Sequence, residues 1–173
     1  MNTRILTLIV VILGAALFRL VPHPPNVTPI AAIALFSGAY LADRRLSLVV
    51  PLLAMLLSDL FLGFYSGMAL TYLAFALSVV LGWSLHSRRA RPLPVLGAAV
   101  GSSLIFYLLT NFGSWATTGL YPHDPAGLLA AYVAGLPFYR NSLAGDLLFT
   151  GLLFWGFHLA ERRIPSLREH VHG

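Results

Sequence analysis

The chain has 173 residues, of which 58% are hydrophobic and only 10% are charged, and its mean hydropathy is +0.80. Soluble domains carry about 25% charged residues, so almost no surface of this chain is left to face water, and the sequence predicts a single integral membrane domain. The formal charge of +5 does not indicate nucleic-acid binding, because all the basic residues are arginines in short clusters between apolar segments. Cysteine is absent, which excludes disulfides and thiolate chemistry.

Six apolar segments are long enough, or nearly so, to cross a bilayer, which takes about 20 residues. In chain order they are residues 4–20, 28–42, 46–63, 67–86, 93–113 and 142–162. The expected fold is therefore an all-α bundle of six transmembrane helices within one domain, residues 1–173. The second segment is short and is expected to be tilted or to continue into its flanks.

The arginines predict how this bundle is oriented, because cytoplasmic loops carry an excess of Lys and Arg. With six spans, one side receives Arg4, Arg44, Arg45, Arg88, Arg89, Arg91, Arg162, Arg163 and Arg168. Only Arg19 and Arg140 fall on the other side. Both termini are thus expected in the cytoplasm, with the protein in a bacterial inner membrane. Alternatively the first segment is a cleaved signal peptide, because Arg4 precedes an apolar run and Gly14-Ala15-Ala16 resembles a cleavage site.

Three connections are expected on the outer side: residues 21–28, residues 63–67 and a long loop, 114–141. Loops of that length are uncommon in compact proteins and often form functional lids. The middle of the long loop is apolar but too short to span, so we expect it to lie at the interface or to fold back over the bundle.

Four charged residues, Arg19, Asp59, Arg140 and Asp146, fall in the same outer layer of the predicted bundle. Ionised groups inside a membrane are expensive, so the two cations and two anions are expected to neutralise one another. They form either a structural ion-pair network or the wall of a binding pocket, and the two interpretations are compatible. Two carboxylates could also serve acid–base catalysis, although no spacing makes that specific.

Other polar and aromatic side chains gather on the outer side. His23 and His123 could bind a ligand, but neither belongs to a metal-binding motif such as HExxH, and no metal site or cofactor is predicted. The aromatic residues form either an interfacial belt or the walls of an apolar pocket with asparagine anchors. The candidate substrate-binding residues are Arg19, His23, Asn26, Asp59, Tyr65, Asn111, Trp115, His123, Arg140, Asn141 and Asp146.

Small residues at four-residue spacing mark helix faces that pack closely. They are Gly97 and Gly101 on the fifth segment, and Ala34, Gly38 and Ala42 on the second. Inside a six-helix bundle such faces serve packing within the molecule, or otherwise the docking of a partner.

Four stretches of the sequence resemble those of a known family: RLVPHPPNVTPIAAIALFSGAY, LLSDLFLG, LTNFGSW and YVAGLPFYRNSLAGDLLF. They resemble a family of small, uncharacterised bacterial membrane proteins assigned to transport. Six helices with elaborate outer loops also resemble the S-components of energy-coupling-factor vitamin transporters, including solitary cobalamin carriers. That resemblance implies a substrate site built from the three outer connections, capture of a vitamin-like molecule there, and release inside by toppling of the bundle. It also implies docking on a coupling membrane protein with ATPases.

The sequence thus predicts a transport protein, not an enzyme, that takes up a small vitamin-like molecule, with a corrinoid such as cobalamin as one candidate. No GxxxxGK[ST] motif occurs in these residues, so energy is expected from a partner or an ion gradient. One alternative is a membrane enzyme acting on a lipid-linked substrate, with Asp59 or Asp146 as base. Another is a ligand-free assembly or scaffold subunit, which predicts a self-paired polar layer without a cavity.

Overall fold

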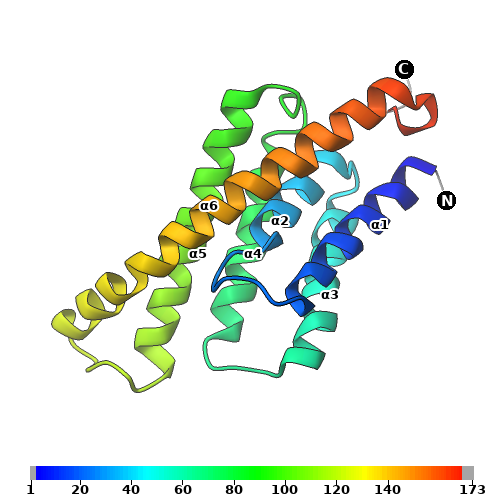
Figure 1. Cartoon of the computed structure of the whole chain (residues 1–173). Coiled ribbons are helices and arrows are strands. Elements are labelled where there is room, and N and C mark those ends of the chain that lie inside the picture. Colours follow the sequence, from blue (N-terminus) through cyan, green and yellow to red (C-terminus); the bar gives the residue numbers. More distant parts are fainter. Residues whose placement is uncertain (1–2, 169–173) are drawn as a thin grey trace.

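A computed structural model describes residues 3–168, and within them the chain is all-α (Figure 1). Six α-helices and two short 3-10 turns follow one another along these residues, without a strand. They are α1 (Thr3–Ala16), η1 (Leu17–Leu20), α2 (Ile30–Tyr40), α3 (Arg44–Leu62), α4 (Met68–Trp83), α5 (Pro92–Thr117), α6 (Pro125–Arg163) and η2 (Pro165–Leu167). The predicted all-α membrane bundle is confirmed.

Four stretches of the described chain are long and apolar enough to cross a membrane, whereas six were predicted. They are α1 together with η1, then α3, α5 and α6. The other two helices are apolar but shorter: α2 has 11 residues and α4 has 16. The prediction overestimated α2 because the proline-rich residues before Ile30 form a separate connection and the helix ends at Tyr40.

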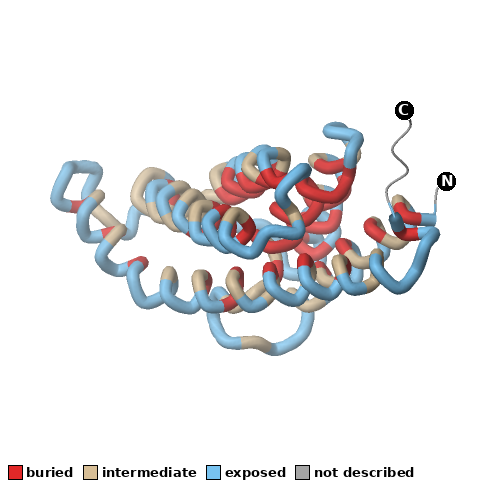
Figure 2. Tube along the Cα trace, turned by 90° about the horizontal axis from the view of Figure 1, so that it is seen from above, coloured by how far each residue is buried: buried red, intermediate tan, exposed pale blue. Residues whose placement is uncertain are grey.

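The short helix α2 lies at the centre of the bundle. Ten of its 11 residues are buried, and Figure 2 shows buried backbone gathered in the interior with exposed backbone on the outer sides of the surrounding helices. A helix that is apolar on all sides is stable only when other elements enclose it. Because its neighbours separate α2 from lipid, it does not need the length of a full span.

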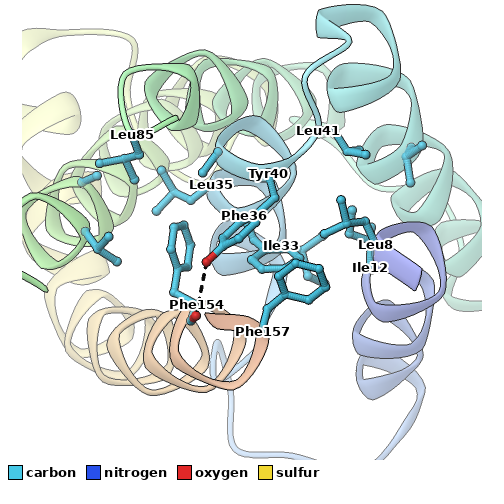
Figure 3. Packing of buried hydrophobic residues seen from close by; sticks show 14 of the residues in the cluster. Leu8, Ile12, Ile33, Leu35, Phe36, Tyr40, Leu41, Leu85, Phe154 and Phe157 are labelled. Carbon is cyan, nitrogen blue, oxygen red and sulfur yellow. Dashed lines mark hydrogen bonds between the residues drawn. The ribbon is translucent and has the colours of Figure 1, made fainter. Parts of the chain in front are cut away.

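An aromatic cluster packs around the carboxyl-terminal half of α2 (Figure 3). Phe36 lies edge-on to Phe154 and Phe157 of α6, with ring centroids 5.6 and 5.5 Å apart. The Tyr40 hydroxyl donates to the Phe154 carbonyl at 3.4 Å. Leu8 and Ile12 of α1, both buried, belong to the same cluster, as do Leu35, Ala39 and Leu41. This cluster joins α1, α2 and α6.

Helices α2 and α4 cross closely in the core, at a pair of glycines. A Cβ added to Gly38 would lie 2.2 Å from the Val79 carbonyl oxygen, and one added to Gly82 would lie 2.5 Å from the Leu35 carbonyl oxygen. Gly38 therefore serves the close packing that the small-residue spacing predicted. Gly97 does not, because a Cβ there would meet nothing within 4 Å.

The end of the bundle where α1 begins and α6 ends is rich in arginine, and we call it the arginine end. Here Arg4 pairs with Glu161 and donates to the Leu167 carbonyl, which ties the first helix to the last. The guanidinium groups of Arg4 and Arg89 lie 6.0 and 5.0 Å from the centre of the Tyr40 ring. Figure 1 shows the start of α1 and the end of α6 close together here.

The predicted long loop 114–141 is wrong, because most of it is helical. Helix α5 continues to Thr117, and α6 runs without interruption from Pro125 for 39 residues, about 58 Å at 1.5 Å per residue. Only residues 118–124 connect the two helices. In Figure 1 the two helices form a hairpin whose tip projects away from the rest of the bundle.

The residues around this connection explain why α6 begins so early. Asp124 accepts a hydrogen bond from the Gly127 amide at 2.7 Å and so caps the helix. Pro125 occupies the first helical position, where its missing N–H costs nothing. Ala131 and Gly135 continue the small, buried face of α6 that begins at Gly127, so the apolar stretch packs along α5 instead of folding over the bundle.

Candidate functional site

A cavity of about 490 Å³ lies at the end of the bundle opposite the arginine end, at the amino terminus of α2. We call this the cavity end. Its wall is formed by side chains from η1, from α2 to α6, and from the connections before α2 and before α4. They are Arg19, His23, Asn26, Thr28, Ile30, Ala31, Met55, Leu62, Tyr65, Thr71, Phe75, Phe106, Thr110, Ser142 and Asp146. The volume falls within the range of about 300–1,000 Å³ that is usual for small-molecule sites.

The connection between α1 and α2 forms one rim of the cavity. His23 stacks on Phe18 with ring centroids 5.8 Å apart. Asn26 adopts φ of 62°, a left-handed conformation that asparagine tolerates better than most residues. The Asn141 side chain on α6 donates to the Pro25 carbonyl at 3.2 Å. Prolines and this contact thus hold His23 and Asn26 against the cavity.

Arg19 and Asp59 form a buried ion pair beside the cavity. Arg19 Nη1 lies 2.7 Å from Asp59 Oδ1, and their side chains are 12% and 0% exposed. The contact between the guanidinium and Asp59 Oδ1 is an ion pair without the geometry of a hydrogen bond. The guanidinium donates its hydrogen bond to Ser58 Oγ, at 2.6 Å. Asp59 Oδ2 accepts a hydrogen bond from the Tyr72 hydroxyl at 2.8 Å. The pair joins η1 to α3, as the ion-pair interpretation predicted, and Tyr72 adds α4.

Asp146 enters the cavity wall from α6, one turn after Ser142, and is 5% exposed. The Ser103 hydroxyl of α5 donates a hydrogen bond to its Oδ2. Among the described residues, the ion pairs formed with aspartate or glutamate are those of Arg4 with Glu161 and Arg19 with Asp59. Asp146 is therefore a buried carboxyl group that no cation of residues 3–168 neutralises.

The amino terminus of α2 also borders the cavity, through Ile30 and Ala31. Pro29 precedes the helix, and no side chain caps it. The first N–H groups of a helix lack partners within the helix and carry partial positive charge. This end of α2 therefore offers hydrogen-bond donors to an acceptor atom in the cavity.

Aromatic and hydroxyl groups complete the wall. Phe75 of α4 and Phe106 of α5 meet edge to face, with ring centroids 5.9 Å apart. Each lies one helical turn from a threonine of the wall, Thr71 and Thr110 respectively. Burial raises the pKa of the Tyr65 phenol above its ordinary value of about 10, so its hydroxyl stays protonated at neutral pH. The wall thus combines apolar surface with a few polar groups, as ligand sites usually do.

A model of a family of unknown function, DUF6580, matches residues 1–167. The chain belongs to this family. No curated protein matches it. No solved structure matches it either.

The geometry separates the candidate residues of this DUF6580 chain into two groups. Arg19, His23, Asn26, Tyr65 and Asp146 line the cavity, and Asp59 lies directly behind Arg19. The remaining five lie outside the cavity wall: Asn111, Trp115, His123, Arg140 and Asn141.

The helical hairpin explains why Asn111, Trp115 and His123 lie elsewhere. The side chain of Asn111 donates to the Tyr107 carbonyl of its own helix at 2.8 Å. At the tip, Trp115 donates to the Pro122 carbonyl at 2.8 Å, and a ring nitrogen of His123 lies 3.0 Å from the Trp115 carbonyl oxygen. A loop could have returned these groups to the cavity, whereas rigid helices carry them away from it.

Within residues 3–168 the ion pair formed among the four charged residues is that of Arg19 with Asp59, so the expected mutual neutralisation does not extend to Arg140 and Asp146. Six residues on a helix correspond to about 600° of rotation, so the two side chains leave α6 on different faces. Arg140 is exposed, and Asp146 lies on the buried face with Ser142 and Thr150. The outer charged layer is thus one ion pair and two separate groups.

Sequence reasoning missed several residues of the wall, although a signal for them existed. Pairs four residues apart place a hydroxyl or carboxyl group beside an aromatic or polar side chain within apolar spans. They are Thr71 with Phe75, Phe106 with Thr110, and Ser142 with Asp146. Such spacing puts both members on one helix face. Within residues 3–168 no three His, Asp or Glu side chains are grouped so as to hold a metal ion.

Proposed function

We propose that this protein binds a vitamin-like small molecule in the cavity and mediates its uptake across a bacterial inner membrane. The observation that carries the proposal is the cavity of about 490 Å³, which combines aromatic walls with Arg19, Asp146 and the uncapped end of α2. Apolar walls with a few convergent polar groups are the usual composition of a ligand site. A short helix that ends inside the membrane beside a cavity is also a feature of transporter binding sites.

The distribution of arginine supports an outward-facing cavity. The cavity lies opposite the arginine end, and cytoplasmic ends of membrane proteins carry the excess of arginine and lysine. In this orientation both termini are cytoplasmic and the cavity faces the outside, where uptake begins. Release on the other side requires a change of conformation, driven by a coupling membrane protein with ATPases, as in the S-components that the chain resembles, or by an ion gradient.

The geometry favours binding over the two alternatives. A scaffold subunit was expected to have a self-paired outer layer without a cavity, yet a cavity is present and Asp146 has no cationic partner among the described residues. For a lipid-processing enzyme, Asp59 is a poor base because Arg19 and Tyr72 already engage its two oxygens. The proposal therefore assigns no catalytic step.

The volume also bears on the class of ligand. A cavity near 490 Å³ suits molecules of ordinary vitamin size and lies in the lower half of the usual range. A corrinoid is a large macrocycle with a nucleotide-bearing arm, and it would enter only in part. We therefore favour a smaller ligand than cobalamin.

A ligand screen with a cavity-filling variant tests the proposal. Detergent-purified protein is heated with vitamins, nucleobases and corrinoids, and a true ligand at a hundredfold excess over Kd stabilises by about 2.7 kcal/mol. Thr110→Phe places a ring in the cavity, and the hydroxyl that it removes donates to the Phe106 carbonyl of its own helix. Leu108→Phe is the matched control, because Leu108 is 44% exposed on the same helix.

We expect the ligand to stabilise the wild type and Leu108→Phe, but not Thr110→Phe. Uptake of the same radiolabelled ligand by cells that express the three proteins should follow the same order. A ligand that stabilises all three equally does not occupy the cavity, and the proposal would then be wrong.

A further inference from the structure

The charges around the cavity specify the class of its ligand. Resting on the proposed function, we infer that the ligand is a cation: a molecule with a protonated amine or a positively charged heteroaromatic ring that pairs with Asp146.

The two arginines of the predicted site are not available to an anion. Arg140 lies outside the cavity wall and is exposed. Arg19 lines the cavity, but Asp59 lies 2.7 Å from its Nη1 and the guanidinium also donates to Ser58. An anionic ligand would have to compete with Asp59, which is fully buried and would then lose its countercharge at a high cost in free energy. The Arg19–Asp59 pair therefore contributes no net charge to the cavity.

Asp146 is the full charge that remains on the wall, whereas the amino terminus of α2 carries only a partial positive charge and suits a hydrogen-bond acceptor of the same ligand. It is 5% exposed, and its described hydrogen bond is the one to Oδ2 from Ser103, which leaves the charge of the carboxylate without a countercharge among residues 3–168. A buried carboxylate is costly unless it is paired with a cation or protonated. A cationic ligand supplies that partner directly from the cavity that Asp146 lines.

The aromatic wall points to the same class. Phe106 lies one helical turn from Ser103, the residue that holds Asp146, so the ring and the carboxyl group are neighbours on the wall. Phe75 stands edge to face with Phe106 across the α4–α5 contact. Aromatic faces attract cations within about 6 Å, and more strongly where water is excluded. A carboxylate beside aromatic rings is a suitable environment for a cationic nitrogen.

Charge-matched probes on one ring test this inference. Purified full-length protein in detergent is titrated with nicotinate, nicotinamide and 1-methylnicotinamide, which are an anion, a neutral molecule and a cation of similar size. Thiamine and choline extend the cationic set, and biotin and pantothenate the anionic one. The readout is the rise in melting temperature with ligand concentration, from which Kd follows.

We expect the cations to stabilise the wild type. In Asp146→Asn their Kd should be about 10- to 100-fold higher, because a charge-assisted contact is lost. Arg140→Gln is the matched control on the same helix and should bind cations as the wild type does. Should Asp146→Asn fail to fold, Ser103→Ala keeps the carboxylate and should retain the preference for cations.

The other outcomes separate the inference from the proposal beneath it. Stabilisation by anions, or by cations equally in Asp146→Asn and the wild type, would overturn the cationic ligand and leave the binding cavity standing. If no compound in this set or in the broader screen stabilises the wild type, the proposed function fails, and the cationic ligand with it.

Discussion

The two ends of α2 are built differently. Around its carboxyl-terminal half, Phe36 and Tyr40 are in van der Waals contact with aromatic rings of α6 and apolar side chains of α1, and both are no more than 1% exposed. At its amino terminus the same helix meets a cavity of about 490 Å³, has no side-chain cap, and is bordered by ionisable groups. One helix thus connects a closely packed region to a hollow one.

This contrast separates residues that stabilise the bundle from residues that are free to bind. At the arginine end, Arg4 and Glu161 neutralise each other, and the rings of Tyr40 and Phe157 pack edge to face. At the cavity end, Asp146 keeps a carboxyl group without a cation from residues 3–168. A buried carboxyl group without a countercharge at the wall of a cavity indicates a site, because such a group is otherwise costly. Mutations at the arginine end should therefore change the stability of the bundle, and mutations at the cavity end should change ligand binding.

The largest effect is expected from breaking the buried pair beside the cavity. Arg19→Met leaves Asp59, which is 0% exposed, without a countercharge and should lower the free energy of unfolding by about 3–5 kcal/mol. The measurement is unfolding of the purified protein by titration with a denaturing detergent. The double variant Arg19→Met/Asp59→Asn removes both charges and should be more stable than the single one. Equal loss in both variants would show that the pairing of charge is not what matters.

The second effect compares the packed end with the hollow end. Phe36→Ala opens a void in a filled interior and should cost about 3 kcal/mol, near the lower end for such substitutions because lipid and core are similarly apolar. Phe106→Ala removes a ring that already borders the cavity and should cost less than Phe36→Ala. The same unfolding titration measures both. A larger loss for Phe106→Ala would mean that the cavity end, and not the aromatic cluster, stabilises the bundle.

The third effect concerns the helix crossing that fixes α2 against α4. Gly38→Ala places a methyl group 2.2 Å from the Val79 carbonyl oxygen, so the backbones must separate, at a cost of about 1–3 kcal/mol. Gly97→Ala is the matched control, because its new methyl group meets nothing within 4 Å and alanine favours helices over glycine. We expect a lower melting temperature for Gly38→Ala only. Equal changes in the melting temperature would show that the glycine face of α2 is no more closely packed than that of α5.

Periodicity and composition predicted the helices, but not where they end. The membrane bundle and the proline-rich rim at residues 21–28 followed from the sequence, because long apolar runs and prolines act locally. The 39-residue α6 did not, because Pro137, Arg140 and Asn141 suggest a break when they are read as local signals. Within a bundle, proline is tolerated in a spanning helix when neighbouring groups satisfy the backbone. Tertiary packing along α5 therefore decided the outcome.

The candidate site was predictable only where it depends on topology. Arg19 and Asp59 lie at helix ends that six alternating helices bring to one side, and they do pair. The association of Asp146 with Ser103 depends on the rotation of α5 against α6, which no local pattern specifies. The position of Trp115 and His123 away from the cavity likewise depends on the length of the α5–α6 hairpin. Chain direction can be read from the sequence, but helix rotation and hairpin length cannot.

The smallest effect is expected at the rim of the cavity. Asn141→Ala removes the hydrogen bond to the Pro25 carbonyl, a contact worth about 0.5–1.5 kcal/mol. Asn141 is exposed, so water replaces part of the lost bond and the melting temperature should change little. Hydrogen exchange of residues 21–29 should nevertheless become faster, because α6 no longer holds this connection, and the ligand should dissociate faster. If exchange there matches the wild type, the prolines and the Phe18–His23 stack alone fix the rim.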